Sequence, residues 1–291
     1  MYKALARRLT KFGVLPGHLP NLIIPGVQKA ATSSLYHYLT QHPSITGGNI
    51  KEIHFFDLDR KFSRGVKWYK QQFPHTRDYI LDATPNYLYE KHIPIRIKET
   101  LGSNVRFIIV LRDPVSRCFS AWNMYRQIAK EPKRVALFAE IERAEPRYKL
   151  FSKYYQNKHF PSFAEAVDFE LQALSSDQAP FVEPGIVRRG FYVEQIEHWL
   201  TIFEKDQLLF LEQENLRGAS LKLSLQRIAA FLEIPQEWDR ISTEAKHVRS
   251  YAGESIDPTT KAKLNHLYGI RNQGLSELTE LKFSWPCLKP S

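Results

Sequence analysis

Residues 22–34 read Leu-Ile-Ile-Pro-Gly-Val-Gln-Lys-Ala-Ala-Thr-Ser-Ser, and this stretch is the most informative one in the chain. A short apolar run ends in Pro25-Gly26, after which small residues and Lys29 lead into the amphipathic segment Leu35–Leu39. That order predicts a strand, a tight loop and the start of a helix. A helix N-terminus offers unpaired N–H groups and the positive end of the helix dipole, which together suit a phosphate or sulfate group. We therefore expect this loop to bind an anion.

The side chains of the loop favour the same interpretation. Lys29 adds a full positive charge, and Thr32, Ser33 and Ser34 add hydroxyl donors. The loop is not a Walker A motif, because that motif ends in Gly-Lys-Ser/Thr with the lysine beside the helix. Here the lysine precedes Thr32 by three residues. The alternative interpretation is an ordinary strand-to-helix turn with an exposed lysine.

The composition is that of a globular protein with a basic surface. The 291 residues suffice for one large α/β domain or for two small ones. Hydrophobic residues make up 43% of the chain, and the formal net charge is +10. That charge points to an anionic partner such as a nucleotide, a polyanionic glycan, a nucleic acid or a membrane surface. Two cysteines, Cys118 and Cys287, are too few for a disulfide framework. We expect a reducing compartment and leave their pairing open.

No window approaches the roughly 18 consecutive apolar residues of a membrane span, and the basic N-terminus Met1–His18 lacks the apolar stretch of a signal peptide. We expect residues 1–20 to form a basic segment, residues 21–291 a single domain, and the polar residues 129–190 a lid-like insertion in it. In that insertion, Arg147–Tyr155 interleaves aromatic and basic residues, which can stack on sugars or bases or form one solvated helix face. The expected location is the cytoplasm, and the oligomeric state stays open.

Apolar runs alternate with helical patterns along the chain. Candidate core strands are Leu22–Pro25, Tyr79–Leu81, Val105–Leu111 and Leu208–Leu211, and candidate helices are Thr32–Gln41, Pro114–Ile128, Tyr192–Phe203 and Leu221–Leu232. This alternation predicts an α/β fold whose mostly parallel sheet is covered by helices on both faces. Ligands of such sheets bind beyond the carboxyl ends of the strands. Because Lys29 and Arg112 each follow the end of a strand, we expect them to meet there.

A second group of ionisable residues lies in the segment Lys51–Asp57, which reads Lys-Glu-Ile-His-Phe-Phe-Asp. In an extended segment Glu52 and His54 would point the same way, with Ile53 on the other face. A carboxylate set among apolar groups can have a raised pKa and serve as a general base. The alternative is an edge segment with two exposed polar residues.

A third group follows the most apolar strand. Asp113-Pro114 predicts a helix start, with the aspartate as N-cap and the proline in the first helical position. Arg112 then lies in the strand-to-helix turn, and Ser120 belongs to a polar stripe along the helix that follows. The arginine and the stripe could hold a second phosphate, or Arg112 could pair with a nearby carboxylate.

In these places the chain resembles one family. Pro25–Ser34 is similar to the 5′-phosphosulfate loop of sulfotransferases that use 3′-phosphoadenosine 5′-phosphosulfate (PAPS). Lys51–Asp57 resembles the Glu-x-x-Phe-Phe segment of the heparan sulfate sulfotransferase branch, whose glutamate is the catalytic base. Arg112 and Ser120, eight residues apart, match the 3′-phosphate element. Further matches are Gly190-Phe191-Tyr192, Gln195, Trp199, Asn272 and Trp285, so the resemblance spans roughly residues 20–287.

The resemblance implies a P-loop-like three-layer fold and sulfuryl transfer from PAPS, which leaves adenosine 3′,5′-bisphosphate. It implies that Lys29 stabilises the bridging oxygen and the sulfate, and that Glu52 removes the acceptor proton, with His54 as helper or rival base. Donor binding is assigned to Lys29, Ala30, Ala31, Thr32, Ser33, Ser34, Arg112, Ser120, Lys246 and Arg249. The last two lie in a segment that resembles the basic loop closing over the cofactor, or is simply an exposed basic loop. We expect no metal requirement, because a transferring sulfate carries less negative charge than a terminal phosphate.

The expected acceptor is a hydroxyl group, most naturally of a carbohydrate, with an amine as the less favoured choice. Heparan-type enzymes usually carry Glu-Lys before Thr-Pro, and Ala83 replaces that lysine here, so the resemblance does not extend to heparan sulfate as the acceptor. The lack of an evident membrane anchor fits a bacterial-type soluble member of the branch. Two other functions remain: a nucleotide-dependent P-loop-type kinase, which would need magnesium, and a non-enzymatic polyanion-binding protein. The chain carries no recognisable nucleic-acid module, so we expect no nucleic-acid partner.

Overall fold

The computed structural model describes residues 17–144, 160–175, 184–239, 241–242 and 255–289. Residues 1–16, most of the predicted N-terminal segment, lie outside this range, as do the run Arg147–Tyr155, Lys246 and Arg249. The chain divides into two compact units: Met1–Arg112 with Gln195–Val248, and Asp113–Glu194 with Arg249–Ser291. The lid-like role predicted for residues 129–190 stays a prediction.

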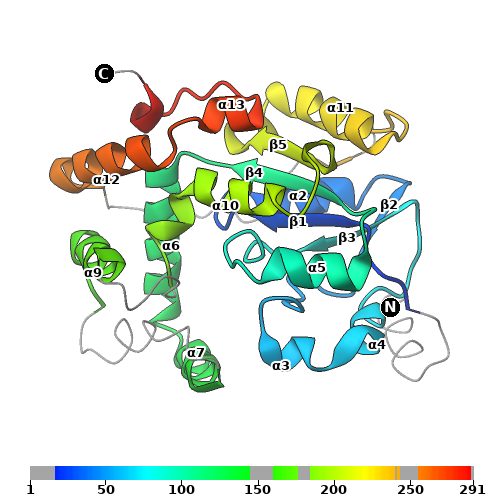
Figure 1. Ribbon diagram of the computed structural model, residues 1–291, viewed down its shortest axis with the longest axis horizontal. Coiled ribbons are helices and arrows are strands. Elements are labelled where there is room, and N and C mark those ends of the chain that lie inside the picture. The colour runs from blue at the N-terminus through cyan, green and yellow to red at the C-terminus, as the bar shows by residue number, and fades with distance from the viewer. Residues whose placement is uncertain (1–16, 145–159, 176–183, 240, 243–254, 290–291) are drawn as a thin grey trace. The chain divides into compact units, whose positions relative to one another are not determined.

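The first unit is built on a five-stranded sheet in the order β2-β3-β1-β4-β5 (Figure 1). The strands are β1 (Leu22–Gly26), β2 (Ile45–Gly47), β3 (Tyr79–Ala83), β4 (Arg106–Leu111) and β5 (Leu208–Glu212), and every neighbouring pair is parallel. The predictions of four core strands and of a parallel sheet are confirmed. The edge strand β2 was missed because three residues are too few to show an alternating pattern.

Helices cover both faces of this sheet, as predicted. The first unit contains α2 (Thr32–Leu39), α3 (Asp59–Phe62), α4 (Gly65–Lys70), α5 (Ile93–Leu101), most of α10 (Tyr192–Leu200) and α11 (Ser220–Leu232). Figure 1 shows α2 behind the strands and α10 in front of them. On the α10 face, the Trp199 ring packs edge-on against Phe107 of β4 at 5.1 Å between centroids. These helical layers and the sheet between them form the expected three-layer α/β fold.

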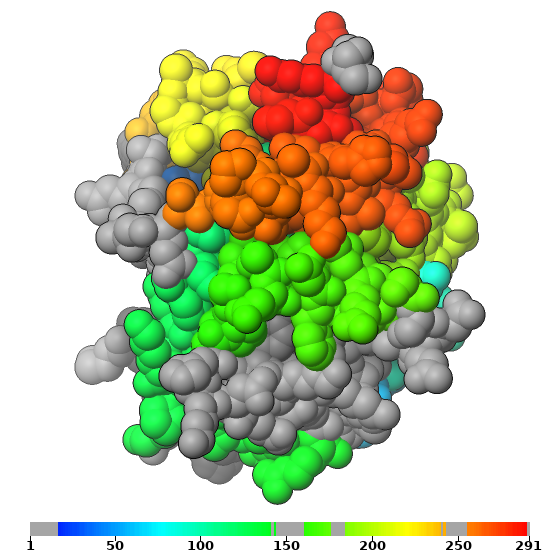
Figure 2. Space-filling view, turned by 90° about the vertical axis from the view of Figure 1, so that its left-hand side faces the viewer, coloured from blue at the N-terminus to red at the C-terminus, as the bar shows by residue number. Residues whose placement is uncertain are grey.

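The second unit is helical in its described part. It contains α6 (Pro114–Ile128), α7 (Pro132–Ala144), α9 (Phe163–Ser175), α12 (Pro258–Arg271) and α13 (Leu275–Thr279), and Figure 2 shows α12 (orange) beside α9 (green). An ion pair between Lys263 and Asp168 joins those two helices. The predicted start of α6 is confirmed, since the Asp113 side chain accepts a hydrogen bond from the Ser116 N–H at 2.9 Å.

Several residues that matched the family by sequence hold this second unit together. The Asn272 side chain accepts from the Tyr192 N–H at 2.7 Å and donates to the Gly190 carbonyl at 2.9 Å. The rings of Tyr192 and Trp285 meet edge-to-face at 6.0 Å. Because these contacts join buried groups, packing of the second unit is enough to explain why these residues match the family. The two cysteines of this unit, Cys118 and Cys287, are free and buried.

Candidate active site

The predicted anion-binding loop runs from the end of β1 to the start of α2. Its backbone is left-handed at Lys29 (φ 74°) and Ala31 (φ 59°), and no side chain caps the first turn of α2. Alternation of left-handed and other backbone conformations turns successive N–H groups toward one side, which makes a concave site for an anion. The uncapped helix N-terminus adds further N–H groups and the positive end of its dipole. The loop therefore has the chemistry to hold a phosphate or sulfate group.

Close packing fixes the position of the loop. The Val27 N–H donates to the Val110 carbonyl at 2.9 Å, and the Leu88 N–H donates to the Pro25 carbonyl at 2.9 Å. A side chain at Gly26 would bring its Cβ to 2.9 Å from the Leu88 Cβ, so only glycine fits here without a shift. Backbone hydrogen bonds on both sides thus hold the loop at the carboxyl end of the sheet.

Arg112 and Lys29 meet at this end of the sheet, as predicted from their positions after β4 and β1. The Arg112 Nη1 donates to the Lys29 carbonyl oxygen at 2.8 Å. This contact places a guanidinium charge against the loop. The hydroxyl residues at the start of α2 are buried at Thr32 and Ser34 and half-buried at Ser33.

The segment that carries Glu52 and His54 reaches its geometry in an unexpected way. The expected extended backbone is wrong, because Glu52 (φ 61°) and His54 (φ 55°) are both left-handed. Their side chains nevertheless approach each other, with 4.0 Å between His54 Nε2 and Glu52 Oε2, while Ile53 is buried. The Glu52 side chain is 42% exposed and pairs with Lys51, so the apolar surroundings expected for this carboxylate are absent.

Asp57 is the ionisable residue of this segment whose side chain is fully buried. Its Oδ2 is 2.6 Å from His54 Nδ1, and its side chain is buried. Burial opposes the charge on both groups, but their mutual attraction outweighs it. The pKa of His54 is therefore raised above its usual value and the pKa of Asp57 is lowered. The result is an imidazole held by a carboxylate, an arrangement suited to taking up a proton.

A buried carboxylate at the end of β3 supports this segment. Asp82 accepts hydrogen bonds from the Tyr69 hydroxyl at 2.8 Å, the Thr84 hydroxyl at 2.9 Å and the Tyr87 hydroxyl at 3.1 Å. Desolvation raises the pKa of Asp82, and those three hydrogen bonds act in the opposite direction. The Tyr87 hydroxyl in turn accepts from the Phe55 N–H at 3.0 Å. The strand end is thereby linked to the segment that carries the candidate base.

Sequence reasoning gave no role to Asp57 or Asp82. Asp57 stands three residues after His54 in a segment already singled out, and a carboxylate at that spacing from an imidazole was the available signal. The role of Asp82 had no sequence signal, because its hydrogen bonds to Tyr69 of helix α4 and to Tyr87 of the turn after β3 follow no periodic pattern.

The donor-binding role of every predicted residue stays a prediction, and three of these residues lie in the second unit or outside the described residues. Ser120 is buried on α6 in the second unit, whereas Lys29 and Arg112 belong to the first. Lys246 and Arg249 lie outside the described residues. The assignment of these three residues to the 3′-phosphate and the closing loop stays a prediction.

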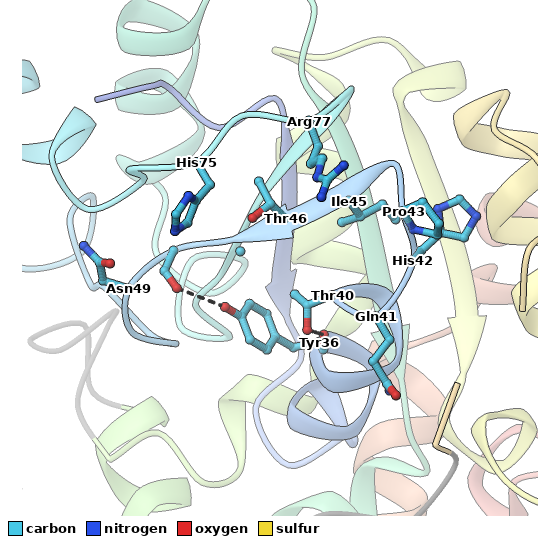
Figure 3. Close-up of a pocket in the computed structure, with 12 residues that line it drawn as sticks. Tyr36, Thr40, Gln41, His42, Pro43, Ile45, Thr46, Asn49, His75 and Arg77 are labelled. Atoms are coloured by element: carbon cyan, nitrogen blue, oxygen red, sulfur yellow. Dashed lines mark hydrogen bonds between the residues drawn. The ribbon is translucent and has the colours of Figure 1, made fainter. Parts of the chain in front are cut away.

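A separate pocket of about 240 Å³ lies along the outer edge of β2 (Figure 3). Its lining includes Thr46, His75 and Arg77, and the Tyr36 hydroxyl donates to the Gly48 carbonyl at 3.4 Å beside it. None of the predicted site residues lines this pocket. Within the described residues, no group of three or more His, Cys, Asp and Glu side chains is arranged to hold a metal ion, and no helix is long and apolar enough to cross a membrane.

Comparisons with known proteins support the family suggested by the sequence and the observed fold. The family model described as "Sulfotransferase domain" matches residues 19–264. Among curated proteins, the mouse heparan sulfate glucosamine 3-O-sulfotransferase 5 is 25% identical over 289 residues, covering 92% of this chain and 74% of the relative. The human bifunctional heparan sulfate N-deacetylase/N-sulfotransferase 3 is 30% identical over 209 residues, covering 68% of this chain and 20% of the relative.

A solved structure supports the fold independently. The sulfotransferase from Alicyclobacillus acidocaldarius superposes with a TM-score of 0.68 at 21% identity, covering 92% of this chain and 98% of its own. The family match extends over the whole sheet and over the segments that carry Lys29, Glu52 and Arg112. The chain therefore belongs to the sulfotransferase family and is a sulfotransferase enzyme.

Proposed function

We propose that the enzyme transfers a sulfuryl group from PAPS to a hydroxyl group of a carbohydrate acceptor. The observation that carries the proposal is the loop between β1 and α2. It combines a concave set of N–H groups, an uncapped helix N-terminus, the charge of Lys29 and the Arg112 guanidinium on its carbonyl. This donor set fits a phosphosulfate, because every group in it is a hydrogen-bond donor or a positive charge.

On the donor side, the residues of the loop hold the 5′ end of the nucleotide. Lys29 stabilises negative charge that develops on the bridging oxygen, while the N–H groups and hydroxyls at Thr32, Ser33 and Ser34 hold the phosphosulfate oxygens. Arg112 and Ser120 are assigned to the 3′-phosphate, and Lys246 and Arg249 to the loop that closes over the nucleotide. PAPS supplies the activated sulfuryl group and leaves as adenosine 3′,5′-bisphosphate.

On the acceptor side, a base at the carboxyl end of β3 takes the proton. The acceptor oxygen forms a bond to sulfur as the bond from sulfur to the bridging phosphate oxygen breaks, and the electron pair stays on that phosphate oxygen. The acceptor proton passes to Glu52, with His54 as the alternative base. His54 lies 4.0 Å from Glu52 and is held by Asp57. Positioning and charge stabilisation supply the rate enhancement, and we propose that no divalent metal takes part.

The acceptor class rests on the relatives. The names of the curated relatives that match this chain specify heparan sulfate as their substrate, and the net charge of +10 suits an acidic glycan. The two 3-O-sulfotransferase 5 relatives match over 92% of this chain, whereas two N-sulfotransferase relatives match over 68% and 75%. A hydroxyl acceptor is accordingly favoured over an amine.

Calorimetric titration with adenosine 3′,5′-bisphosphate in the presence of EDTA tests the donor class, with ATP and magnesium as the comparison. We expect micromolar or tighter binding of the bisphosphate and a loss of at least tenfold in the Arg112→Ala variant. Preference for ATP with magnesium would instead support the kinase interpretation. Salt-sensitive binding of polyanions without any preference for the bisphosphate would support a non-enzymatic role.

A further inference from the structure

A continuous line of polar side chains runs inward from the candidate base. The His54 imidazole contacts the Asp57 carboxylate at 2.6 Å, and the Asn86 Nδ2 donates to the same Asp57 oxygen at 2.8 Å. The same Nδ2 donates to Glu90 Oε1 at 3.1 Å. The other oxygen of Glu90 lies 3.8 Å from His92 Nδ1. One amide thus stands between two carboxylates, and each carboxylate faces an imidazole.

The centre of this line is shielded from solvent. Asp57 is 0% exposed, Asn86 9% and Glu90 4%. In such surroundings a carboxylate needs donors for its oxygens, and two neighbouring carboxylates repel each other unless a donor lies between them. Asn86 supplies that donor to both. Since both partners are acceptors, the amide nitrogen must face them, which fixes the orientation of the amide.

The backbone around Asn86 is hydrogen-bonded to the end of β1, which leads into the predicted anion-binding loop. The Tyr87 N–H donates to the Thr84 carbonyl at 3.1 Å, and the Leu88 N–H donates to Pro25 at the end of β1. Asn86 and Glu90 therefore lie on a segment whose backbone is hydrogen-bonded to the end of β1, just before the loop proposed to bind PAPS. A side chain on this support can hold Asp57 in one orientation.

The fixed carboxylate determines which nitrogen of His54 is basic. Asp57 accepts at its Oδ2 and so favours the tautomer with hydrogen on Nδ1. The Nε2 atom, which lies 4.0 Å from Glu52, is then the atom able to take up a proton. If the carboxylate could rotate, the imidazole would lose this constraint.

We propose that Asn86 and Glu90 are positioning residues that fix the tautomer and the proton affinity of His54. Neither was assigned a role by sequence or by family resemblance. The proposal rests on the proposed function only in taking His54 as part of the proton-accepting machinery. The hydrogen bonds themselves are independent of any substrate.

The charges around His54 act in both directions. Burial opposes the imidazolium most strongly and Lys61 adds to this effect, whereas the charges of Asp57, Glu52 and Asp82 favour it. Glu90 adds a further negative charge behind Asn86, and His92 offsets that charge when it is protonated. Removal of the Glu90 charge should therefore lower the pKa of His54.

Nitrogen-15 NMR of histidine-labelled protein, without donor or acceptor, tests the proposal directly. The His54 signals are assigned from their loss in His54→Ala. In wild-type protein we expect the neutral imidazole to carry its hydrogen on Nδ1. In Asn86→Ala we expect a mixture of tautomers. In Glu90→Gln, which keeps an acceptor for Asn86 but removes the charge, we expect the Nδ1–H tautomer with a lower His54 pKa.

Tyr79→Phe is the matched control, because it removes a side-chain hydrogen bond of the same unit, from the Tyr79 hydroxyl to the Leu232 carbonyl at 2.8 Å. We expect it to lower thermal stability and leave the His54 tautomer unchanged. Tautomer and pKa values in Asn86→Ala and Glu90→Gln that equal those of the control would overturn the proposal. Kinetics then supply a second readout: about tenfold lower kcat in Asn86→Ala, with the KM for PAPS unchanged. A protein that lacks sulfuryl transfer but shows the expected NMR changes would refute the proposed function and leave this inference intact.

Discussion

Lys29→Ala isolates the contribution of one charge to the proposed transfer step. The substitution shortens the side chain after Cβ, so the left-handed backbone at this position (φ 74°) is no more strained than before. The hydrogen bond from Arg112 goes to the Lys29 carbonyl, which the variant keeps. The backbone bonds of Val27 and Leu88 are also retained. The loop should therefore keep its shape and lose only the ammonium group.

The expected magnitude follows from the role of that group. Removal of one preorganised donor aimed at developing charge costs about 2.7–4 kcal/mol in activation free energy, or about 10²–10³-fold in kcat. Binding of adenosine 3′,5′-bisphosphate should weaken much less, because the N–H groups of the loop and Arg112 remain. Lys29→Arg keeps a positive charge and should retain more activity than Lys29→Ala.

Single-turnover transfer of radiolabelled sulfate from PAPS, with the enzyme in excess, measures the chemical step, and calorimetry with the bisphosphate measures binding. Wild-type turnover in Lys29→Ala would refute the assignment of charge stabilisation to this residue. A parallel loss of the same size in both turnover and bisphosphate affinity would show that Lys29 contributes uniform binding, and the transition-state argument would then be wrong.

Three further predictions concern the candidate base and the packing of the second unit. Glu52→Gln should cut kcat while bisphosphate affinity stays within about threefold, whereas a larger loss in His54→Ala with a near-normal Glu52→Gln would move the base to His54. Because the pKa of His54 is raised in the folded state, protonation of His54 stabilises the fold below about pH 6.5, and this stabilisation is lost as the pH rises through the folded pKa. Because the pKa of Asp57 is lowered, its ionisation stabilises the fold above about pH 3.8. Urea unfolding should hence show a larger cost of Asp57→Asn at pH 5.5 than at pH 8.5, and equal costs would contradict the ion pair. Gly190→Ala should lower the unfolding free energy by about 1–3 kcal/mol, since its Cβ would lie 2.6 Å from the buried Tyr268 ring; an unchanged melting temperature would mean that the ring can move aside.

The layers of the fold and the loop between β1 and α2 could be predicted from the amino-acid sequence. Continuous apolar runs such as Val105–Leu111 mark central parallel strands, because both faces of such strands are covered. The Asp-Pro start of α6 and the small residues before Thr32 are local signals, since a cap and a tight turn involve only neighbours along the chain. Strand order does not follow from such signals, but the position of a residue after a strand end does. This is why the meeting of Arg112 with Lys29 could be predicted.

The tertiary structure decided how the candidate base is held. The backbone at Glu52 and His54 is left-handed because contacts from elsewhere fix it, including the bond from the Glu52 N–H to the Ala83 carbonyl at 3.2 Å. The sequence pattern predicts an extended backbone for this segment, since the β region is the usual conformation of non-glycine residues outside helices. Asn86, which donates to Asp57, likewise comes from a turn beyond β3. Hydrogen bonds between segments far apart in the chain leave no periodic trace in the sequence, so the burial of Asp57 and its contact with Asn86 became visible only in the folded chain.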